Sequence, residues 1–122
     1  MVTGGAVRIG KAITQALQLA GAEVVVHYRN SRAEAEALSP YSVCADLASP
    51  DDCRELVKLA GDIDILVNNA SLFTRDTLAD ATPDRVQREF QVNLFAPMEL
   101  TRQFAAQTDS GAVVNLLDRR IR

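Results

Sequence analysis

The stretch at residues 3–10 constrains the fold of this chain most strongly, because glycines stand there between an apolar start and an amphipathic segment. Met1 and Val2 fit the end of a strand, and Gly4 can adopt the positive φ that turns a chain sharply. Gly10 lacks a Cβ, so a helix beginning there can lie close to the strand or to a bound ligand. Its N-terminus would offer free N–H groups to a pyrophosphate. The pattern T-G-x-x-x-R-x-G is therefore typical of a dinucleotide-binding turn, although an ordinary strand-to-helix turn is the open alternative.

Short apolar runs alternate with helical periodicity along the rest of the chain. We expect strands at residues 1–3, 22–28, 41–45, 65–67 and 112–117, and helices at 9–20, 32–38, 50–60 and 83–104. In the last of these helices one face should carry Val86, Phe90, Leu94 and Phe95, continued by Met98, Leu100 and Phe104. Ser31, Ser49 and Thr82 are expected N-caps, and Gly21 a C-cap. The alternation predicts an α/β fold, a Rossmann-like doubly wound parallel sheet with helices on both faces.

Length and composition are typical of a single globular domain. The 122 residues are enough for one domain, residues 1–122. A net charge of −3 gives no sign of a nucleic-acid or membrane partner, and no apolar run could span a bilayer. Cys44 and Cys53 lack metal-ligand partners at useful spacing, so we expect no metal site and a reduced, cytoplasmic protein.

Polar residues follow several of the expected strands, at the edge where α/β sheets bind ligands. The second strand end distinguishes between cofactors, since an acid there usually binds the ribose 2′-hydroxyl of NAD. No acid lies between His27 and Arg32. Arg29 and Ser31 stand there instead, and with Arg8 they could bind a 2′-phosphate through charge-assisted hydrogen bonds. We therefore expect NADP, with a solvated basic loop as the alternative.

The motifs together resemble the short-chain dehydrogenase/reductase family. They are T-G-x-x-x-R-I-G, Asp46-Leu47, Asn68-Asn69-Ala70-Ser71 and Asn93 in Val92-Asn93-Leu94. Within that family, Arg8 in place of the middle glycine and the segment from His27 to Ser31 resemble pteridine reductases. Asp118 also fits this subgroup. Most of the family carries a catalytic serine at that place, whereas pteridine reductases carry an aspartate. The resemblance covers nearly the whole chain.

The resemblance implies a role for each matching residue. Cofactor-binding residues would be Gly4, Arg8, Ile9, Gly10, Arg29, Asn30, Ser31, Asp46, Leu47, Asn69, Ala70 and Ser71. Asn93 would position a group in a proton relay, and Asp118 would assist protonation of the substrate. Arg8 would also face the substrate, and Phe73 would stack on a flat pteridine ring.

These roles have plainer alternatives. Asn93 could bond a nearby backbone, Phe73 could be a loop or core aromatic, and Asp118 could be a solvated acid. His27, the single histidine, is interpreted as a strand-end residue with a satisfied ring, and we assign it no chemistry.

The catalytic Tyr-x-x-x-Lys pair of the family is missing from this sequence. Residues four positions after Tyr28 and Tyr41 are Arg32 and Ala45, so neither tyrosine forms the pair. The last strands of the family fold are also missing, and the connections near residues 38–41, 60–62 and 107–111 are short. We therefore expect the sequence to represent part of a longer protein, incomplete at its C-terminal end.

The favoured function is reduction of a pteridine-type C=N bond by hydride transfer from NADPH. The alternatives are a reductase of the same family acting on a carbonyl C=O bond, and a non-catalytic nucleotide-binding or sensor fragment. A flavodoxin-like binding module is less favoured, since it would not need Asn68-Asn69-Ala70. The partner would be a small molecule, a pterin or a carbonyl compound. The resemblance also suggests a homotetramer whose interfaces include residues 83–104.

Overall fold

The computed structural model describes residues 1–117 as alternating helices and short strands. The helices are α1 (Arg8–Leu19), α2 (Arg32–Leu38), α3 (Pro50–Ala60), α4 (Pro83–Phe90), the π-helical turn η1 (Gln91–Phe95) and α5 (Ala96–Gln107). The strands are β1 (Val26–Tyr28), β2 (Ser42–Cys44), β3 (Ile65–Asn68) and β4 (Ala112–Asn115). None of the helices in this part of the chain has both the length and the hydropathy needed to cross a bilayer.

Val2 connects two parallel strand pairs into one sheet. β1 pairs with β2, and β3 pairs with β4, both in parallel. Val2 forms parallel bridges to Val26 on one side and to Val67 on the other, which places the first strand in the centre. The spatial order is therefore β2, β1, Val2, β3 and β4, and the predicted parallel sheet is confirmed.

The strands expected at residues 22–28, 41–45 and 112–117 are shorter than the sequence predicts, and the last one pairs only over Ala112–Asn115. The expected strand at residues 22–28 forms a ladder only over Val26–Tyr28, and the one at residues 41–45 only over Ser42–Cys44. Val2 lies opposite Val26 and donates to the carbonyl oxygen of Val25, so residues 22–24 extend beyond Met1 and have little neighbouring backbone with which to pair. A strand forms only where a partner strand runs beside it.

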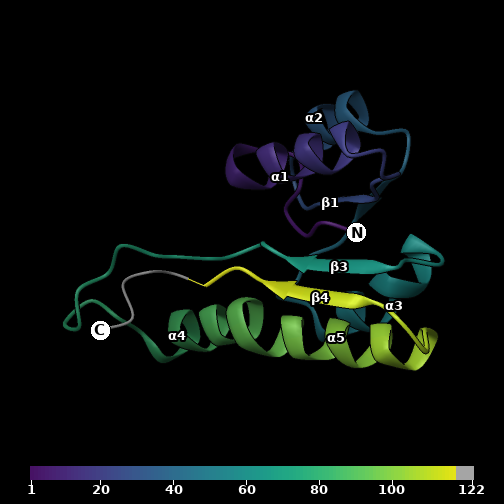
Figure 1. The fold of residues 1–122 in the computed structure, drawn as a ribbon. Coiled ribbons are helices and arrows are strands. Elements are labelled where there is room, and N and C mark those ends of the chain that lie inside the picture. Colours follow the sequence, from purple (N-terminus) through teal and green to yellow (C-terminus); the bar gives the residue numbers. More distant parts are fainter. Residues whose placement is uncertain (118–122) are drawn as a thin grey trace.

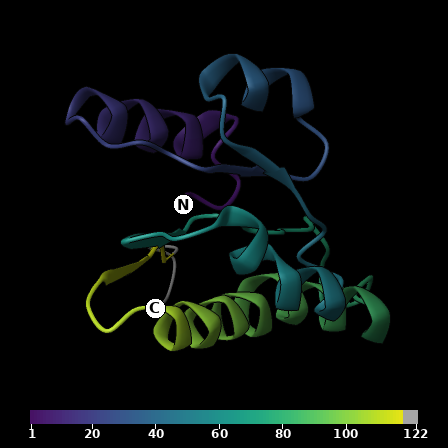
Figure 2. The ribbon, with the colours of Figure 1, turned by 90° about the vertical axis from the view of Figure 1, so that its right-hand side faces the viewer.

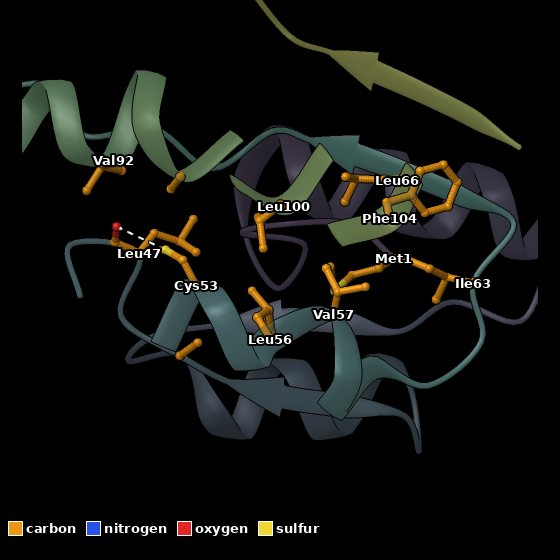
Figure 3. Packing of buried hydrophobic residues seen from close by; sticks show 12 residues of the cluster. Met1, Leu47, Cys53, Leu56, Val57, Ile63, Leu66, Val92, Leu100 and Phe104 are labelled. Carbon is orange, nitrogen blue, oxygen red and sulfur yellow. Dashed lines mark hydrogen bonds between the residues drawn. The ribbon is translucent and has the colours of Figure 1, made fainter. Parts of the chain in front are cut away.

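Helices cover both faces of the sheet, as Figures 1 and 2 show. α1 and α2 lie on one face, over a buried cluster that includes Val2, Val26 and Ala35. α3 and α5 lie on the other face, over a larger cluster in which Leu56, Leu66 and Leu100 are fully buried. Figure 3 shows these side chains meeting between α3, β3 and α5. The doubly wound arrangement is thus confirmed.

The helix ends follow the expected signals with one exception. Gly21, at φ 90°, ends α1 in a Schellman motif, because its N–H bonds Gln18 O and the next N–H bonds Leu17 O. Ser49 and Thr82 accept hydrogen bonds from the first turns of α3 and α4. Ser31 stands at the start of α2, but its side chain makes no capping bond. The prediction that Ser31 caps this helix is therefore wrong.

The single apolar face predicted for residues 83–104 is also wrong. The structure has two stripes, each spaced by four residues. Val92, Ala96, Leu100 and Phe104 are buried against the core, whereas Val86, Phe90, Leu94 and Met98 are exposed. The extra residue of the π-helical turn lies between α4 and α5 and changes the helical phase between them.

Candidate cofactor-binding site

A cavity of about 360 Å³ lies at the carboxyl ends of the strands, between the turn before α1 and the loops after β1, β2 and β3. All of the predicted cofactor-binding residues line it: Gly4, Arg8, Ile9, Gly10, Arg29, Asn30, Ser31, Asp46, Leu47, Asn69, Ala70 and Ser71. Parallel strands bring their carboxyl ends to one edge, which is why residues far apart in sequence meet here.

Thr3 connects the glycine turn at Gly4 to the end of β3 through hydrogen bonds. No role in the site was predicted for this residue from the sequence. Its buried hydroxyl accepts from the backbone N–H groups of Asn69 and Ala70, at 2.9 and 3.0 Å. The Asn69 amide in turn donates to the carbonyl oxygen of Thr3 at 2.8 Å. The turn and the end of β3 therefore behave as one unit. The signal for Thr3 was its place directly before the glycine.

The start of α1 points toward the cavity without a side-chain cap. Val7 precedes the helix and makes no capping bond, and the first turn contains no acidic residue. Arg8, the first residue of the helix, has φ +52°, a left-handed conformation that non-glycine residues rarely adopt. The uncapped N–H groups and the partial positive charge of this helix end suit an anion.

Charged side chains cluster where β1 and β2 end. The Asp46 carboxylate lies 3.8 Å from the Arg29 guanidinium and 3.2 Å from that of Arg88, which comes from α4. Its Oδ1 also accepts from the N–H of Ala48 at 2.9 Å. Arg88 was not predicted for this site, because nothing in the sequence places α4 beside the end of β2.

His27 is buried at the base of the cavity with both ring nitrogens bonded. Nδ1 lies 3.1 Å from the N–H of Gly4, and Nε2 lies 3.1 Å from the carbonyl oxygen of Ala45. Burial lowers the pKa of the ring, opposed by the hydrogen bond to Ala45 and by the charge of Asp46. The expectation of a satisfied ring is confirmed. Its place in the cavity wall fits the strand-end position that the sequence predicts.

Two of the residues predicted to act in catalysis or substrate binding, Asn93 and Phe73, do not line this cavity. Asn93 bonds the backbone of Leu72 through both amide atoms, at 2.8 and 2.7 Å, which is the plainer alternative stated above. Phe73 is 69% exposed and belongs to the loop after β3. Asp118 lies outside the described residues. Within residues 1–117, no cluster of three or more His, Cys, Asp or Glu side chains could bind a metal ion.

Comparison with known proteins finds dehydrogenases and reductases. The family model for short chain dehydrogenase matches residues 1–117. D-erythrulose reductase of Gallus gallus is 34% identical and aligns with 95% of this chain but 50% of its own length. The glucose and ribitol dehydrogenase homolog of Oryza sativa is 32% identical, over 98% of this chain and 45% of its own. The chain thus spans about half the length of these relatives.

Solved structures share the same architecture. FolM alternative dihydrofolate reductase 1 from Brucella suis, in complex with NADP, superposes with a TM-score of 0.89 at 38% identity, over 97% of this chain and 56% of that one. A short chain dehydrogenase from Burkholderia cenocepacia, also with NADP, gives 0.90 at 30% identity, over 99% and 56%. The match of the family model to nearly every residue, together with the turn, sheet order and cavity described above, shows that this chain belongs to the short-chain dehydrogenase family.

Proposed function

We propose that this protein binds NADP(H) in the cavity at the strand ends and is part of an NADPH-dependent oxidoreductase. The observation that carries the proposal is the set of cavity-lining residues: a glycine turn, an uncapped helix start and a basic loop around one space. A Cβ at Gly10 would clash with the carbonyl oxygen of Gly4 at 2.1 Å, so the turn requires glycine there. Neighbouring structures of the family crystallised with NADP support the same cofactor.

The residues present fit the parts of this cofactor. The start of α1 and the turn at Gly4 would bind the pyrophosphate. Arg29, Asn30 and Ser31 would bind the 2′-phosphate, and Asp46 with Leu47 would flank the adenine. Asn69, Ala70 and Ser71 would line the ribose and nicotinamide side. When bound, the cofactor supplies a hydride to the substrate.

The substrate that we propose is a pteridine-type compound with a C=N bond. The 38% identity to an alternative dihydrofolate reductase supports it, together with Arg8 at the cavity edge. Arg8 and Phe73 would contact this substrate, Asp118 would assist its protonation, and Asn93 would act by fixing the loop that carries Phe73. A carbonyl substrate is the second candidate, favoured by the 34% identity to D-erythrulose reductase.

We also propose a cytoplasmic homotetramer. The exposed stripe of Val86, Phe90, Leu94 and Met98 along α4 and α5 supports an interface on these helices. Sedimentation velocity tests this directly. Phe90→Asp combined with Met98→Asp should shift the protein to smaller species, and an unchanged sedimentation coefficient would contradict the interface.

Cofactor choice is tested by titration with NADPH and NADH. Arg29→Ala should weaken NADPH binding about 10- to 100-fold, because a hydrogen bond to a charged group contributes about 1.5–3 kcal/mol. NADH binding should stay within a factor of about two, since NADH has no 2′-phosphate. Arg32→Ala is the matched control, because this exposed guanidinium pairs with Glu36 at 2.7 Å on α2. Equal losses for both cofactors in Arg29→Ala would contradict the 2′-phosphate role.

Turnover distinguishes the remaining alternatives. NADPH oxidation with a dihydropteridine and not with a ketose would support C=N reduction, and the reverse would support the carbonyl reductase. NADPH binding without oxidation of either substrate would favour the non-catalytic binding protein.

A further inference from the structure

His27 connects two sides of the cavity through its ring. The side chain is 3% exposed and comes from the middle of β1. A carbonyl oxygen can only accept, so Nε2 carries the hydrogen that is donated to Ala45 O over 3.1 Å. Nδ1 is then unprotonated and accepts from the N–H of Gly4 over 3.1 Å. One neutral tautomer therefore satisfies both bonds.

The two groups that His27 bonds belong to the segments that would contact the pyrophosphate and the adenine of the cofactor. Gly4 forms the turn beneath the start of α1. Ala45 directly precedes Asp46 and Leu47 on the adenine side. The backbone already connects these segments, through His27 N–H to Val2 O, Gly5 N–H to His27 O and Ala45 N–H to Tyr28 O, each at 3.1 Å. The imidazole adds a crosslink at the point where the ladders end.

We propose that His27 is a positioning residue of the cofactor site, fixing the Gly4 turn relative to the Ala45–Leu47 segment so that both contact one cofactor. This inference rests on the proposed NADP(H) binding. His27 itself acts through the backbone groups of Gly4 and Ala45 and need not touch the reacting atoms.

The ordinary alternative is a core histidine that only stabilises the fold. The chain offers a matched control for it. Ser39 is also 3% exposed, and its hydroxyl bridges two backbone groups, donating to Val24 O at 2.7 Å and accepting from Tyr41 N–H at 3.0 Å. It lies at the other end of β1, away from the cavity. Ser39→Ala should therefore lower the melting temperature without changing the Kd of the folded protein.

Two substitutions separate the two bonds of the ring. The amide of His27→Asn reaches the place of Nδ1 and can still accept from Gly4. The longer amide of His27→Gln reaches the place of Nε2 and can still donate to Ala45. We titrate NADPH, which spans both sides of the cavity, and adenosine 2′-phosphate, which contains only the adenosine side.

We expect His27→Gln to raise the Kd for NADPH about 5- to 10-fold while leaving that for adenosine 2′-phosphate within a factor of about two. His27→Asn should raise both. Unchanged NADPH affinity in folded His27 variants, or losses no larger than in Ser39→Ala, would overturn the proposal. Wild-type protein that binds neither ligand would instead overturn the proposed function, and with it this inference.

A measurement on the unmodified chain keeps the proposal testable if the variants fail to fold. His27 is the single histidine, so its two ring nitrogens give unambiguous ¹⁵N signals. We expect the neutral Nε2–H tautomer at pH 7, before and after addition of NADPH. A charged ring or the Nδ1–H tautomer would overturn the bridge.

The affinity of wild-type protein for NADPH should also fall in acid, because a protonated Nδ1 cannot accept from Gly4. The ionisable side chains on the segments around the ring are Arg8, Tyr28, Arg29, Cys44 and Asp46. Of these, Asp46 raises the pKa of His27 against the larger effect of burial. His27→Asn should lack this acid-dependent component, and an identical pH profile in wild type and His27→Asn would count against the proposal.

Discussion

Gly10 packs so closely against the carbonyl group of Gly4 that a Cβ at residue 10 would lie 2.1 Å from its oxygen. The same Cβ would lie 2.6 Å from Nδ2 of Asn69, the amide that bonds the backbone of Thr3. The start of α1, the turn and the end of β3 therefore meet at one point, and only a residue without a side chain fits there.

The first prediction concerns this contact. Gly10→Ala should lower the free energy of unfolding by about 3 kcal/mol or more, because the clashing atoms include backbone that cannot move aside. Gly21→Ala is the control: Gly21 has φ +90° in the Schellman motif with no atom within 4 Å of an added Cβ, so only conformational strain of about 1 kcal/mol applies. Urea unfolding compares the two. Equal losses would mean that the close contact does not limit residue 10.

Arg8 carries the second prediction, since its φ of +52° is costly for any residue except glycine. Arg8→Gly should raise the free energy of unfolding by about 1 kcal/mol and weaken NADPH binding. Arg8→Ala loses the same charge but keeps a Cβ, so it should weaken binding without the gain in stability. Thermal unfolding and NADPH titration of both variants check this. A more stable Arg8→Ala would show that the charge, and not the conformation, is unfavourable.

The placement of the site could be predicted from the sequence because it depends on topology. Once strands and helices alternate, parallel strands must end at one edge, and the residues after them must meet there. Arg29, Asp46 and Asn69 therefore line one cavity as expected.

Contacts that depend on packing could not be predicted in the same way. The two partners of His27 and the position of Arg88 beside Asp46 follow from how separate elements approach one another. Apolar spacing could not identify the π-helical turn at Gln91–Phe95, because the apolar residues on either side of it fit one continuous helix.

Asn93 gives the third prediction. Its amide makes two hydrogen bonds to the backbone of Leu72, so Asn93→Ala leaves both groups without these partners. We expect a loss of about 1–2 kcal/mol of unfolding free energy and faster tryptic cleavage at Arg75 in the same loop. Gln91→Ala is the control, because Gln91 makes one longer bond, 3.4 Å, to Leu47 O. If cleavage at Arg75 is not accelerated in Asn93→Ala, these bonds do not fix the loop.

The two cysteines should differ in reactivity, which is the fourth prediction. Cys44 is exposed, whereas Cys53 is 1% exposed and burial raises its pKa to about 11. A thiol reagent at pH 8 should therefore modify one thiol rapidly in the native protein and the second only on unfolding. Cys44→Ser should remove the fast phase and Cys53→Ser the slow one. Two thiols reacting at one rate in native protein would contradict the burial of Cys53.

The last prediction concerns stability in acid. Hydrogen bonds from Arg102, and then from Gln103, lower the pKa of Glu99 to about 2. The folded state therefore favours the charged carboxylate, whose stabilising effect is complete above the ordinary pKa of 4.5 and is lost as the pH falls toward 2. Urea unfolding between pH 2 and 6 should show a shallower acid loss of stability in Glu99→Gln than in wild type.

Arg102→Gln, which removes the largest cause of this shift, should reproduce the shallower profile. Arg54→Gln removes the smallest cause and should leave the profile close to that of wild type. A Glu99→Gln profile parallel to wild type from pH 2 to 6 would mean that the carboxylate is not preferentially charged in the folded protein. Gln103 on α5 donates to Glu99 at 2.7 Å and to the carbonyl oxygen of Cys53 on α3 at 3.0 Å. The Glu99 carboxylate therefore also orients the amide that connects α5 to α3.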